Sequence, residues 1–578
     1  MTRWARDVTP ESVWPEYPRP QMRRVQWQNL NGLWDYGVTP KESHTPAFEG
    51  DILVPFPIES ALSGVKRALL PSERLWYRRT FTIPDDWAGQ RLLLHFGAVD
   101  WECVVWVNGH EVGEHRGGYL PFYFDVTEHV LRGEANELVV AVWDPSDRHW
   151  QQRGKQVLHP KGIWYTAVSG IWQTVWLEPV PQTYIDRLKL TPDIGAGGLD
   201  VAVALAGDPP GAQVEVTALD GGVQVGAASG PAGCTLHIPI PDPRLWSPDD
   251  PHLYDLQVTV RQAGQVVDAV ESYFGMRSFS MEPDGQGRLR LCLNGAPLFH
   301  YGPLDQGCWP DGLYTPPSAA AMRYDVEFTK RLGCNMLRKH VKVEPARFYY
   351  DCDRLGMIVW QDMPNGGKPV GALLSFLAIM FAKLTRRDDR AYWRAGRGDQ
   401  AARDDYWREL REMVDHLHTF ACIGMWVPFN EGWGQFDANE VAQWLQAYDP
   451  TRPVDHASGW FDQGGGDFRS IHVYFKALAP EDPDARRGVI LSEFGGYTLK
   501  LDGHVWNPDA AFGYKTFDSK EALGAAYAEL LEAQLAPWIE RGLSGAVYTQ
   551  TTDVELEVNG FLTYDREVVK MKPTFSRE

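Results

Sequence analysis

The sequence predicts two β-sandwiches followed by an eight-stranded α/β barrel, and three observations support this architecture. The chain has 578 residues, which at about 150 residues per domain corresponds to about three or four domains. Short apolar runs of strand length, separated by Gly, Pro and Asn, fill residues 1–280 with almost no helical periodicity. After residue 280, such runs alternate with segments whose apolar residues lie three and four positions apart.

Residues 1–180 are predicted to form a jelly-roll β-sandwich. Its clearest strand candidates are 91–96, 101–107, 137–143 and 171–180. The dipeptide Asn108-Gly109 after the second of these is suited to a two-residue hairpin turn. Residues 181–280 stay β-like but are poorer in aromatic residues and richer in Gly, with a turn signal roughly every ten residues, so we expect an immunoglobulin-like sandwich there.

Residues 281–578 are predicted to form a (β/α)8 TIM barrel, because they contain eight strand candidates and fall in the usual length range of that fold. The candidates are 298–303, 334–340, 356–362, 423–430, 453–459, 470–475, 489–494 and 544–550. Apolar residues at helical spacing predict helices over 407–420 and 523–538. The second helix is expected to begin at Asp518, with Glu521 three residues later, and to end near Gly542.

The charge balance and the cysteines exclude several classes of protein. Lys and Arg number 56 against 76 Asp and Glu, and no stretch concentrates the basic residues, so we expect no nucleic-acid or anionic-membrane partner. Seven scattered cysteines without a CxxC pair predict reduced thiols. The N-terminal residues lack the apolar core of a signal peptide, and the longest apolar run, 371–384, is too short to span a bilayer. We therefore expect a soluble cytoplasmic protein, in which 371–384 packs on the barrel or forms a homo-oligomer contact.

Two glutamates close predicted strands of the barrel. Glu431 ends the fourth strand, directly after Asn430, and Glu493 ends the seventh. Reactive groups of such barrels project from the C-terminal strand ends. A lone Glu at a strand end is more often a structural ion-pair partner, but two carboxylates at one barrel mouth are what glycosidic cleavage requires. One protonates the leaving oxygen, while the other attacks the anomeric carbon or activates water.

Five segments then carry a resemblance to a known family. They are LWYRRTFTIP (75–84), SGIWQTVWLEPV (169–180), NMLRKH (335–340), PFNEGW (428–433) and LSEFGG (491–496). With these segments and this order of domains, the sequence resembles glycoside hydrolase family 2 over nearly its whole length. The resemblance implies a sugar-binding jelly roll at 1–180, an immunoglobulin-like sandwich at 181–280 and a catalytic barrel at 281–578.

The resemblance also implies roles for single residues. Glu431 would be the general acid/base and Glu493 the nucleophile, with Asn430 bonding the sugar 2-hydroxyl and Tyr474 orienting Glu493. Before the attack Glu431 must hold a proton, and Trp426, Phe429 and Trp433 are candidates for apolar walls that favour this state.

Further candidates lie at the other strand ends, and each has a structural alternative. Arg338 and His340 either contact the cleaved sugar or form a salt bridge with Asp362 or Asp305. The histidines either bond sugar hydroxyls or satisfy buried carbonyls, and the polar residues after the eighth strand either bind sugar or hold their own loop. Among Trp309, Trp460 and Trp506 we expect about one to stack on substrate. The candidate substrate-binding residues are Asn430, Tyr474, Arg338, His340, Asp305, Trp433, His456, His472, Trp460, Gln550 and Asp553.

The predicted function is that of an exo-acting retaining β-glycosidase, with a β-galactosidase-like preference and a glycoside or oligosaccharide as substrate. The family's glucuronidases bind the sugar carboxylate with an Asn-x-Lys motif, but here Gly560 and Phe561 follow Asn559, so the lysine is missing. The segment 360–367 does not reproduce the magnesium-ligand spacing of the bacterial β-galactosidases, and no metal or other cofactor is predicted. A β-mannosidase, a β-glucuronidase, an arabinosidase and a carbohydrate-binding protein without turnover remain alternatives.

Overall fold

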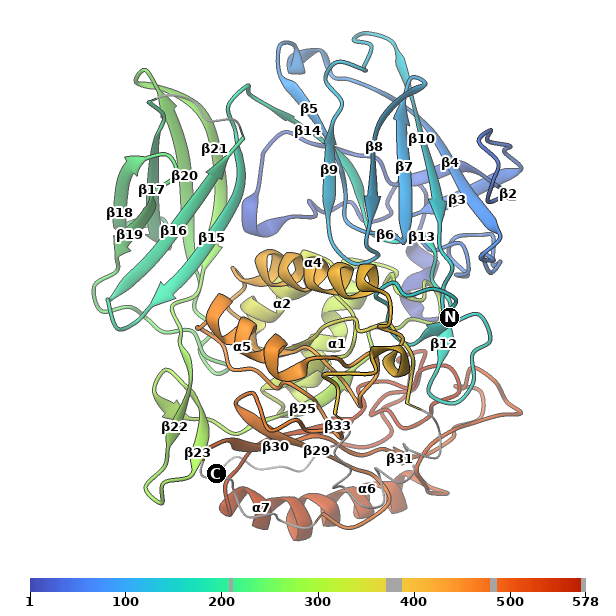
Figure 1. Cartoon of the computed structure of the whole chain (residues 1–578), viewed down its shortest axis with the longest axis vertical. Coiled ribbons are helices and arrows are strands. Elements are labelled where there is room, and N and C mark those ends of the chain that lie inside the picture. The colour runs from blue at the N-terminus through green and yellow to red at the C-terminus, as the bar shows by residue number, and fades with distance from the viewer. Residues whose placement is uncertain (207–210, 371–386, 479–485, 573–578) are drawn as a thin grey trace.

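The computed structural model describes residues 1–206, 211–370, 387–478 and 486–572 and confirms the predicted fold class. Two β-sandwiches stand side by side over one side of an α/β barrel (Figure 1). The apolar run 371–384 lies outside the described residues. Within the described ranges no helix is both long and apolar enough to cross a bilayer. All seven cysteines lie in these ranges, and none of them forms a disulfide bond.

The first sandwich consists of a six-stranded sheet in the order β3-β2-β4-β10-β7-β8 and a four-stranded sheet in the order β1-β14-β5-β9. Alternate side chains of both sheets fill the core between them, such as Leu75 and Val105 of the six-stranded sheet and Leu94 of the four-stranded sheet. The predicted hairpin is confirmed, since Asn108 and Gly109 join β7 to β8 with φ of 50° and 78°. The strands are β1 (Gln28–Asn29), β2 (Gly32–Pro40), β3 (Gly50–Val54), β4 (Glu73–Thr82), β5 (Arg91–Phe96), β6 (Val99–Asp100), β7 (Glu102–Val107), β8 (His110–Arg116), β9 (Phe122–Asp125), β10 (Ala135–Trp143), β11 (Gln156–Val157), β12 (Tyr165–Thr166), β13 (Gly170–Ile171) and β14 (Val175–Val180).

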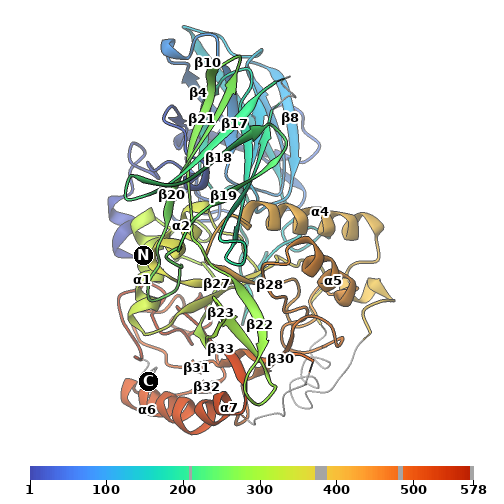
Figure 2. The ribbon, with the colours of Figure 1, turned by 90° about the vertical axis from the view of Figure 1, so that its left-hand side faces the viewer.

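Within the described residues the second sandwich has seven strands, as in an immunoglobulin-like domain. This sandwich lies toward the viewer in Figure 2. Sheet β15-β16-β19 faces sheet β18-β17-β20-β21 across an aliphatic core. A small sheet of β22, β23 and β24 leads into the barrel. The domain boundaries near residues 180 and 280 remain predictions. The strands are β15 (Ile185–Asp193), β16 (Gly198–Leu205), β17 (Gln213–Asp220), β18 (Val223–Pro231), β19 (Thr235–Pro239), β20 (Tyr254–Gln262), β21 (Gln265–Phe274), β22 (Phe279–Pro283), β23 (Leu289–Leu293) and β24 (Ala296–Pro297).

The barrel is built on one curled parallel sheet in the order β28-β27-β26-β25-β33-β30-β29. Residues 453–459, predicted as the fifth strand, form no regular ladder. One isolated parallel bridge joins Val454 to Trp426 of β28, and a second joins Ser458 to Asn430, which follows β28. Backbone hydrogen bonds accompany both bridges, and the Asp467 N–H donates to the Val454 carbonyl on the other side. Pro453 has no N–H to donate, which is one reason why no regular ladder forms there. The strands are β25 (His300–Asp305), β26 (Met336–Lys339), β27 (Ile358–Asp362), β28 (Ile423–Val427), β29 (Phe468–Val473), β30 (Gly488–Gly495) and β33 (Leu543–Thr549). A separate pair, β31 (Tyr497–Thr498) and β32 (Lys515–Thr516), follows β30.

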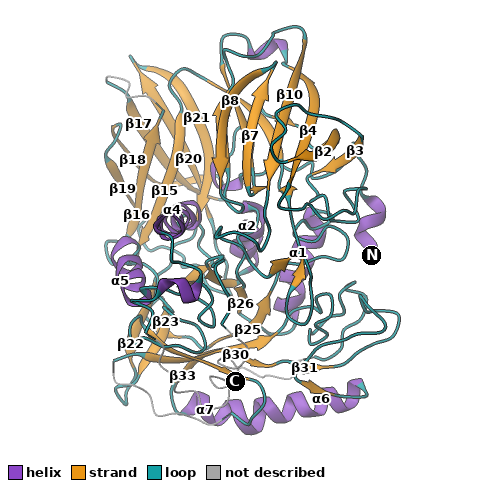
Figure 3. Ribbon diagram, turned by 45° about the vertical axis from the view of Figure 1, so that its right-hand side comes forward, coloured by secondary structure: helices purple, strands orange, loops and turns teal. Residues whose placement is uncertain are grey.

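Helices surround these strands (Figure 3), and both predicted helices are present. One corresponds to α4, and the other is realised as α6, a π-helical segment and α7 in succession. The expected start at Asp518 is wrong by one residue: Ser519 has the extended backbone of an N-cap, and its hydroxyl accepts a hydrogen bond from the Ala522 N–H. The helices are α1 (Ala319–Arg331), α2 (Ala346–Leu355), α4 (Gln400–Leu417), α5 (Ala438–Tyr448), α6 (Lys520–Glu529), the π-helix Leu530–Leu535 and α7 (Ala536–Glu540).

Candidate active site

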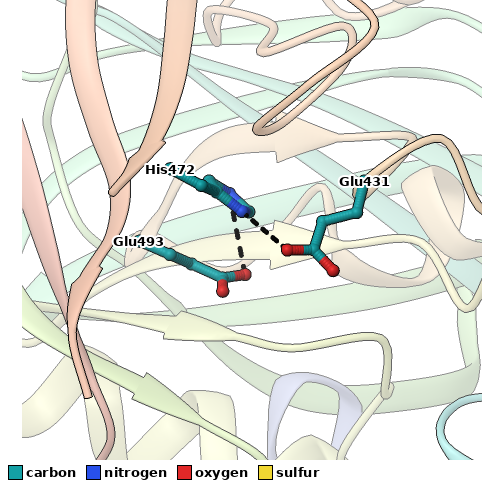
Figure 4. Close-up of side chains that lie close together, drawn as sticks. All are labelled: Glu431, His472 and Glu493. Carbon is teal, nitrogen blue, oxygen red and sulfur yellow. Dashed lines mark hydrogen bonds and ion pairs between the residues drawn. The ribbon is translucent and has the colours of Figure 1, made fainter. Parts of the chain in front are cut away.

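The two glutamates predicted at the barrel mouth lie next to each other. Glu493 is in β30, and Glu431 follows the end of β28. One oxygen of each carboxylate and one ring nitrogen of His472 all lie within 4.8 Å of one another (Figure 4). Both glutamates are largely buried, with 9% of Glu431 and 4% of Glu493 exposed.

His472, from β29, stands between the two carboxylates. Its Nδ1 lies 3.0 Å from Glu431 Oε1, and its Nε2 lies 3.7 Å from Glu493 Oε1 and 3.0 Å from Ser458 Oγ. Gly459 allows this position, because its φ is 88° and a Cβ there would lie 2.8 Å from the imidazole Nδ1. His472 therefore couples the two carboxylates through one ring.

Arg338, from β26, is fully buried and holds several groups of the site. Its Nη1 donates to Glu493 Oε1 at 3.1 Å, its Nη2 to Asn430 Oδ1 at 2.9 Å, and its Nε to Asp362 Oδ1 at 2.9 Å. Arg338 thus forms the predicted salt bridge with Asp362 and also contacts Glu493. Burial alone would raise the pKa of Glu493, but the nearby ring of His472 and the guanidinium of Arg338 lower it more and hold that pKa at about 2. Glu493 is therefore ionised at neutral pH.

Tyr474 follows β29 and donates its hydroxyl proton to Glu493 Oε2. The hydroxyl also lies 3.1 Å from Thr549 Oγ1, and the ring stacks on Tyr514 with 4.0 Å between centroids. Burial raises the pKa of the Tyr474 phenol well above its ordinary value, so the phenol keeps its proton. Tyr474 thus orients Glu493 by a hydrogen bond to its charged form.

The backbone at Glu431 is held in a sparsely populated conformation. Its φ is 52°, and its N–H donates to the Ser458 carbonyl at 2.9 Å. A left-handed backbone at a residue with a side chain costs about 1 kcal/mol or more and is found preferentially at functional positions. The bridge between Asn430 and Ser458 maintains this geometry and aims the Glu431 side chain into the barrel mouth.

Of the three aromatic rings expected to form apolar walls around Glu431, only that of Trp433 lies at the barrel mouth according to its contacts. Trp426 donates its indole N–H to Asp449, beyond the end of α5, and Phe429 stacks on Tyr406 of α4. Trp433 instead stacks on Trp164 of the first sandwich, with 5.1 Å between ring centroids.

Two further predicted residues contact this group, and a third bonds within a loop beside it. His340 Nδ1 lies 2.7 Å from Asp362 Oδ2, and Trp460 meets the ring of His472 edge-on at 5.5 Å. Burial lowers the pKa of His340 well below its ordinary value, so its ring is neutral. His456 Nε2 accepts a hydrogen bond from the Gln463 N–H at 3.1 Å, within the neighbouring loop.

The remaining predicted residues form hydrogen bonds, ion pairs or ring contacts with other protein side chains. Asp305 pairs with Lys339 at 2.7 Å, and Asp553 pairs with Lys570 at 2.6 Å. Gln550 donates to Asn559 Oδ1 at 2.7 Å, while its Oε1 has no partner among the described residues. Of the tryptophans outside the barrel mouth, Trp309 lies under the Arg566 guanidinium, and Trp506 is 45% exposed beside Tyr564.

Sequence reasoning missed the part of the first sandwich that reaches the barrel. The connection 144–174 docks there through the Tyr165 hydroxyl, which donates to Glu557 at 2.5 Å, and through the Thr166 N–H, which donates to Glu555 at 2.8 Å. It carries Lys155 toward the mouth. The only sequence signal was its length, because a long connection with few strand residues often has a functional role.

The Glu431, His472 and Glu493 cluster is also the one group of potential metal ligands found in the part of the chain that the structure describes. Glu493 already accepts hydrogen bonds from Arg338 and Tyr474, and His472 lies within hydrogen-bonding distance of Glu431 and Ser458. The ligand atoms of this cluster are therefore already engaged with neighbouring protein side chains.

Comparisons with known proteins found family models that match the two sandwiches and relatives that align with more of the chain. The family models described as "Glycosyl hydrolases family 2, sugar binding domain" and "Glycosyl hydrolases family 2" match residues 40–181 and 183–277. A β-galactosidase of Thermoanaerobacter pseudethanolicus is 25% identical over 409 residues, which cover 66% of this chain and 48% of the relative. A β-glucuronidase of Paenibacillus borealis is 26% identical over 310 residues, which cover 50% of each chain. The chain thus spans about half the length of these two curated relatives.

Solved structures show the same fold over nearly the whole chain. The β-D-glucuronidase of Dictyoglomus thermophilum superposes with a TM-score of 0.72 at 18% sequence identity and covers 95% of this chain and 96% of its own. The β-glucuronidase of Ruminococcus gnavus gives 0.72 at 17% identity, with 96% and 97% covered.

Proposed function

Since the chain belongs to glycoside hydrolase family 2, we propose that it is a retaining exo-acting β-glycosidase. It would remove a terminal non-reducing sugar by double displacement. The observation that carries the proposal is the buried group of Glu431, His472 and Glu493 at the barrel mouth. A carboxylate held ionised by cations, facing a second carboxyl group across one imidazole, has the composition of a nucleophile and a general acid/base.

In the proposed first step, Glu493 attacks the anomeric carbon while Glu431 protonates the leaving oxygen. A glycosyl ester on Glu493 results, and Glu431 then accepts a proton from the water that hydrolyses it. Retaining pairs lie about 5 to 5.5 Å apart and inverting pairs about 6.5 to 9.5 Å apart. The separation of less than 4.8 Å between one oxygen of each carboxylate supports retention.

Asn430 and Arg338 prepare this chemistry. The Asn430 amide oxygen accepts from Arg338, so the amide NH₂ is left to donate to the sugar 2-hydroxyl. The positive charge of the same arginine balances the negative charge of the Glu493 carboxylate before the attack. Tyr474 donates to the carboxylate oxygen that Arg338 does not bind, which fixes the plane of the nucleophile.

The proposed sugar preference is β-galactoside. The β-galactosidase among the relatives supports it, as does the missing lysine after Asn559. Because other relatives are named β-glucuronidases, a β-glucuronide is the second candidate. A β-mannoside and an arabinoside remain further alternatives within the same chemistry.

Hydrolysis of a panel of nitrophenyl glycosides tests the proposal. The panel contains the β-galactoside, β-glucoside, β-mannoside, β-glucuronide, β-xyloside and α-L-arabinosides, with Glu493→Gln as the inactive variant and the exposed Glu567→Gln as its matched control. We expect one sugar to be cleaved, Glu493→Gln to be inactive, and the first product seen by proton NMR to be the β-anomer for a β-glycoside. An α-anomer from such a substrate excludes the retaining mechanism. Failure to cleave any substrate from acid to neutral pH, with glycan binding retained, favours a binding protein.

A further inference from the structure

One buried lysine of the described residues differs from the others in its contacts. Lys339, Lys342 and Lys570 are each bonded to a buried carboxylate, namely Glu344 for the first two and Asp553 for the third. Lys155 is only 6% exposed, yet its ammonium makes no hydrogen bond or ion pair with any residue that the structure describes. A largely enclosed ammonium is stabilised by hydrogen bonds, so the unused donors of Lys155 are available to a ligand.

Lys155 belongs to the first sandwich but lies at the barrel mouth. Its ammonium is 5.6 Å from the ring centroid of Trp433 and 5.8 Å from that of Tyr165. The preceding residue, Gly154, packs so closely on the barrel that a Cβ there would lie 2.9 Å from the Val341 carbonyl oxygen. Residue 155 thus lies beside the end of β26, where His340 precedes Val341.

The docking of the connection fixes the position of Lys155. The Gln152 side chain bridges Asp405 and Arg397 at 3.1 and 2.7 Å, and Tyr314 donates to the Gln156 side chain. The Lys155 carbonyl also accepts a hydrogen bond from the Tyr165 N–H at 3.0 Å. The lysine backbone is therefore anchored on both sides.

His340 offers the complementary unpartnered atom. Its Nδ1 faces Asp362, whose carboxylate already accepts two hydrogen bonds from Arg338, so this nitrogen carries the imidazole proton. The ring is neutral, and its buried Nε2 has no partner among the described residues. Of the charged groups that act on the pKa of His340, Lys155 has the largest effect. His340 Nε2 is thus an acceptor near a cationic donor.

We propose that Lys155 is a substrate-binding residue contributed by the first sandwich, and that it binds one hydroxyl of the sugar together with His340. The lysine ammonium donates to the hydroxyl oxygen, and the hydroxyl proton is donated to His340 Nε2. This inference rests on the proposed function and extends it to the choice of sugar. A hydroxyl both accepts and donates, whereas a carboxylate only accepts and leaves Nε2 unpaired. The pair therefore selects a neutral hydroxylated sugar at this position.

The experiment compares the glycoside that the panel identifies, by hydrolysis or by binding, with its 2-, 3-, 4- and 6-deoxy analogues. The variants are Lys155→Met and His340→Phe, with Lys161→Met, an exposed lysine of the same connection, as the matched control. Two quantities are measured: kcat/KM, and the Kd by calorimetry in the Glu493→Gln background, where no turnover interferes.

For one of the deoxy analogues, the kcat/KM and the affinity of the wild-type protein should be about 10- to 100-fold lower than for the parent glycoside. This is the factor expected when a hydrogen bond to a charged donor is removed. On the parent glycoside, Lys155→Met should lower kcat/KM and affinity by a similar factor. On that deoxy analogue, Lys155→Met should differ little from the wild-type protein, because the hydrogen bond is already absent. His340→Phe should show the same pattern for the same deoxy analogue. Lys161→Met should behave as wild type.

If the loss caused by each substitution and the loss caused by each missing hydroxyl multiply for every deoxy analogue, the inference is overturned. The proposed function is then unaffected. If no glycoside is hydrolysed but the dependence appears in the Kd values, the inference stands and the proposed function fails. Absence of both hydrolysis and binding overturns both.

Discussion

Replacing Arg338 by Gln should change the pH dependence of the proposed nucleophile. In the native site the pKa of Glu493 is about 2, against an ordinary value of 4.5. This difference corresponds to ~3 kcal/mol in favour of the carboxylate. The guanidinium is fully buried and 3.1 Å from Glu493, so it is one of the main sources of this free energy.

In Arg338→Gln the burial of Glu493 remains while one of the opposing charges is lost. We expect its pKa to rise toward, or above, the ordinary value of a glutamate. The sign follows directly: a nucleophile with a higher pKa is protonated as the pH falls, so kcat/KM should decrease below about pH 5 in the variant. In wild-type protein, protonation of Glu493 should cause no such decrease above about pH 3.

The assay is kcat/KM on a nitrophenyl glycoside between pH 3 and 8, because this leaving group needs little protonation by Glu431. Arg338→Lys, which keeps the positive charge, should retain more of the wild-type profile. Thermal melts at each pH identify any loss caused by unfolding. If Arg338→Gln is slower but has the wild-type pH profile, the cation does not control the ionisation of Glu493, and the reasoning is refuted.

Three further predictions concern the site and its support. Glu431→Ala should lose about 10²- to 10⁴-fold in kcat/KM on alkyl glycosides but much less on nitrophenyl glycosides, and azide should restore turnover with retained configuration; equal losses on both substrates would exclude the acid/base role. Tyr474→Phe should lower kcat about 10- to 100-fold, because a hydrogen bond to the charged nucleophile is lost, with the melting temperature nearly unchanged. A much lower melting temperature would point to a structural role instead. Asp449→Asn should lower the free energy of unfolding in urea by about 3 to 5 kcal/mol, because it leaves the fully buried Arg452 without its ion-pair partner. Asp250→Asn, in an exposed pair, is the matched control and should leave the urea midpoint unchanged, so equal shifts in both variants would contradict the argument.

The strands could be predicted where local pattern and burial coincide. The apolar run at 91–96 has the same bounds as β5, and seven of the eight barrel candidates correspond to strands of the parallel sheet. The segment 453–459 differs, because its pairing depends on which backbone groups face the neighbouring strands and not on its apolar content. The shift of the helix start from Asp518 to Ser519 has a similar cause, since both side chains are able to cap and only the backbone path selects one.

The positions of Glu431 and Glu493 followed from the sequence by itself, because a parallel barrel brings the C-terminal ends of its strands to one mouth. The tertiary structure alone decided what surrounds them. His472 stands between the carboxylates, Arg338 binds both Glu493 and Asn430, and Lys155 reaches the mouth from another domain. Periodicity reports whether a residue is buried, but the partners of a buried charge come from distant parts of the chain. These partners set its ionisation and its geometry, and they exist only once the domains have packed together.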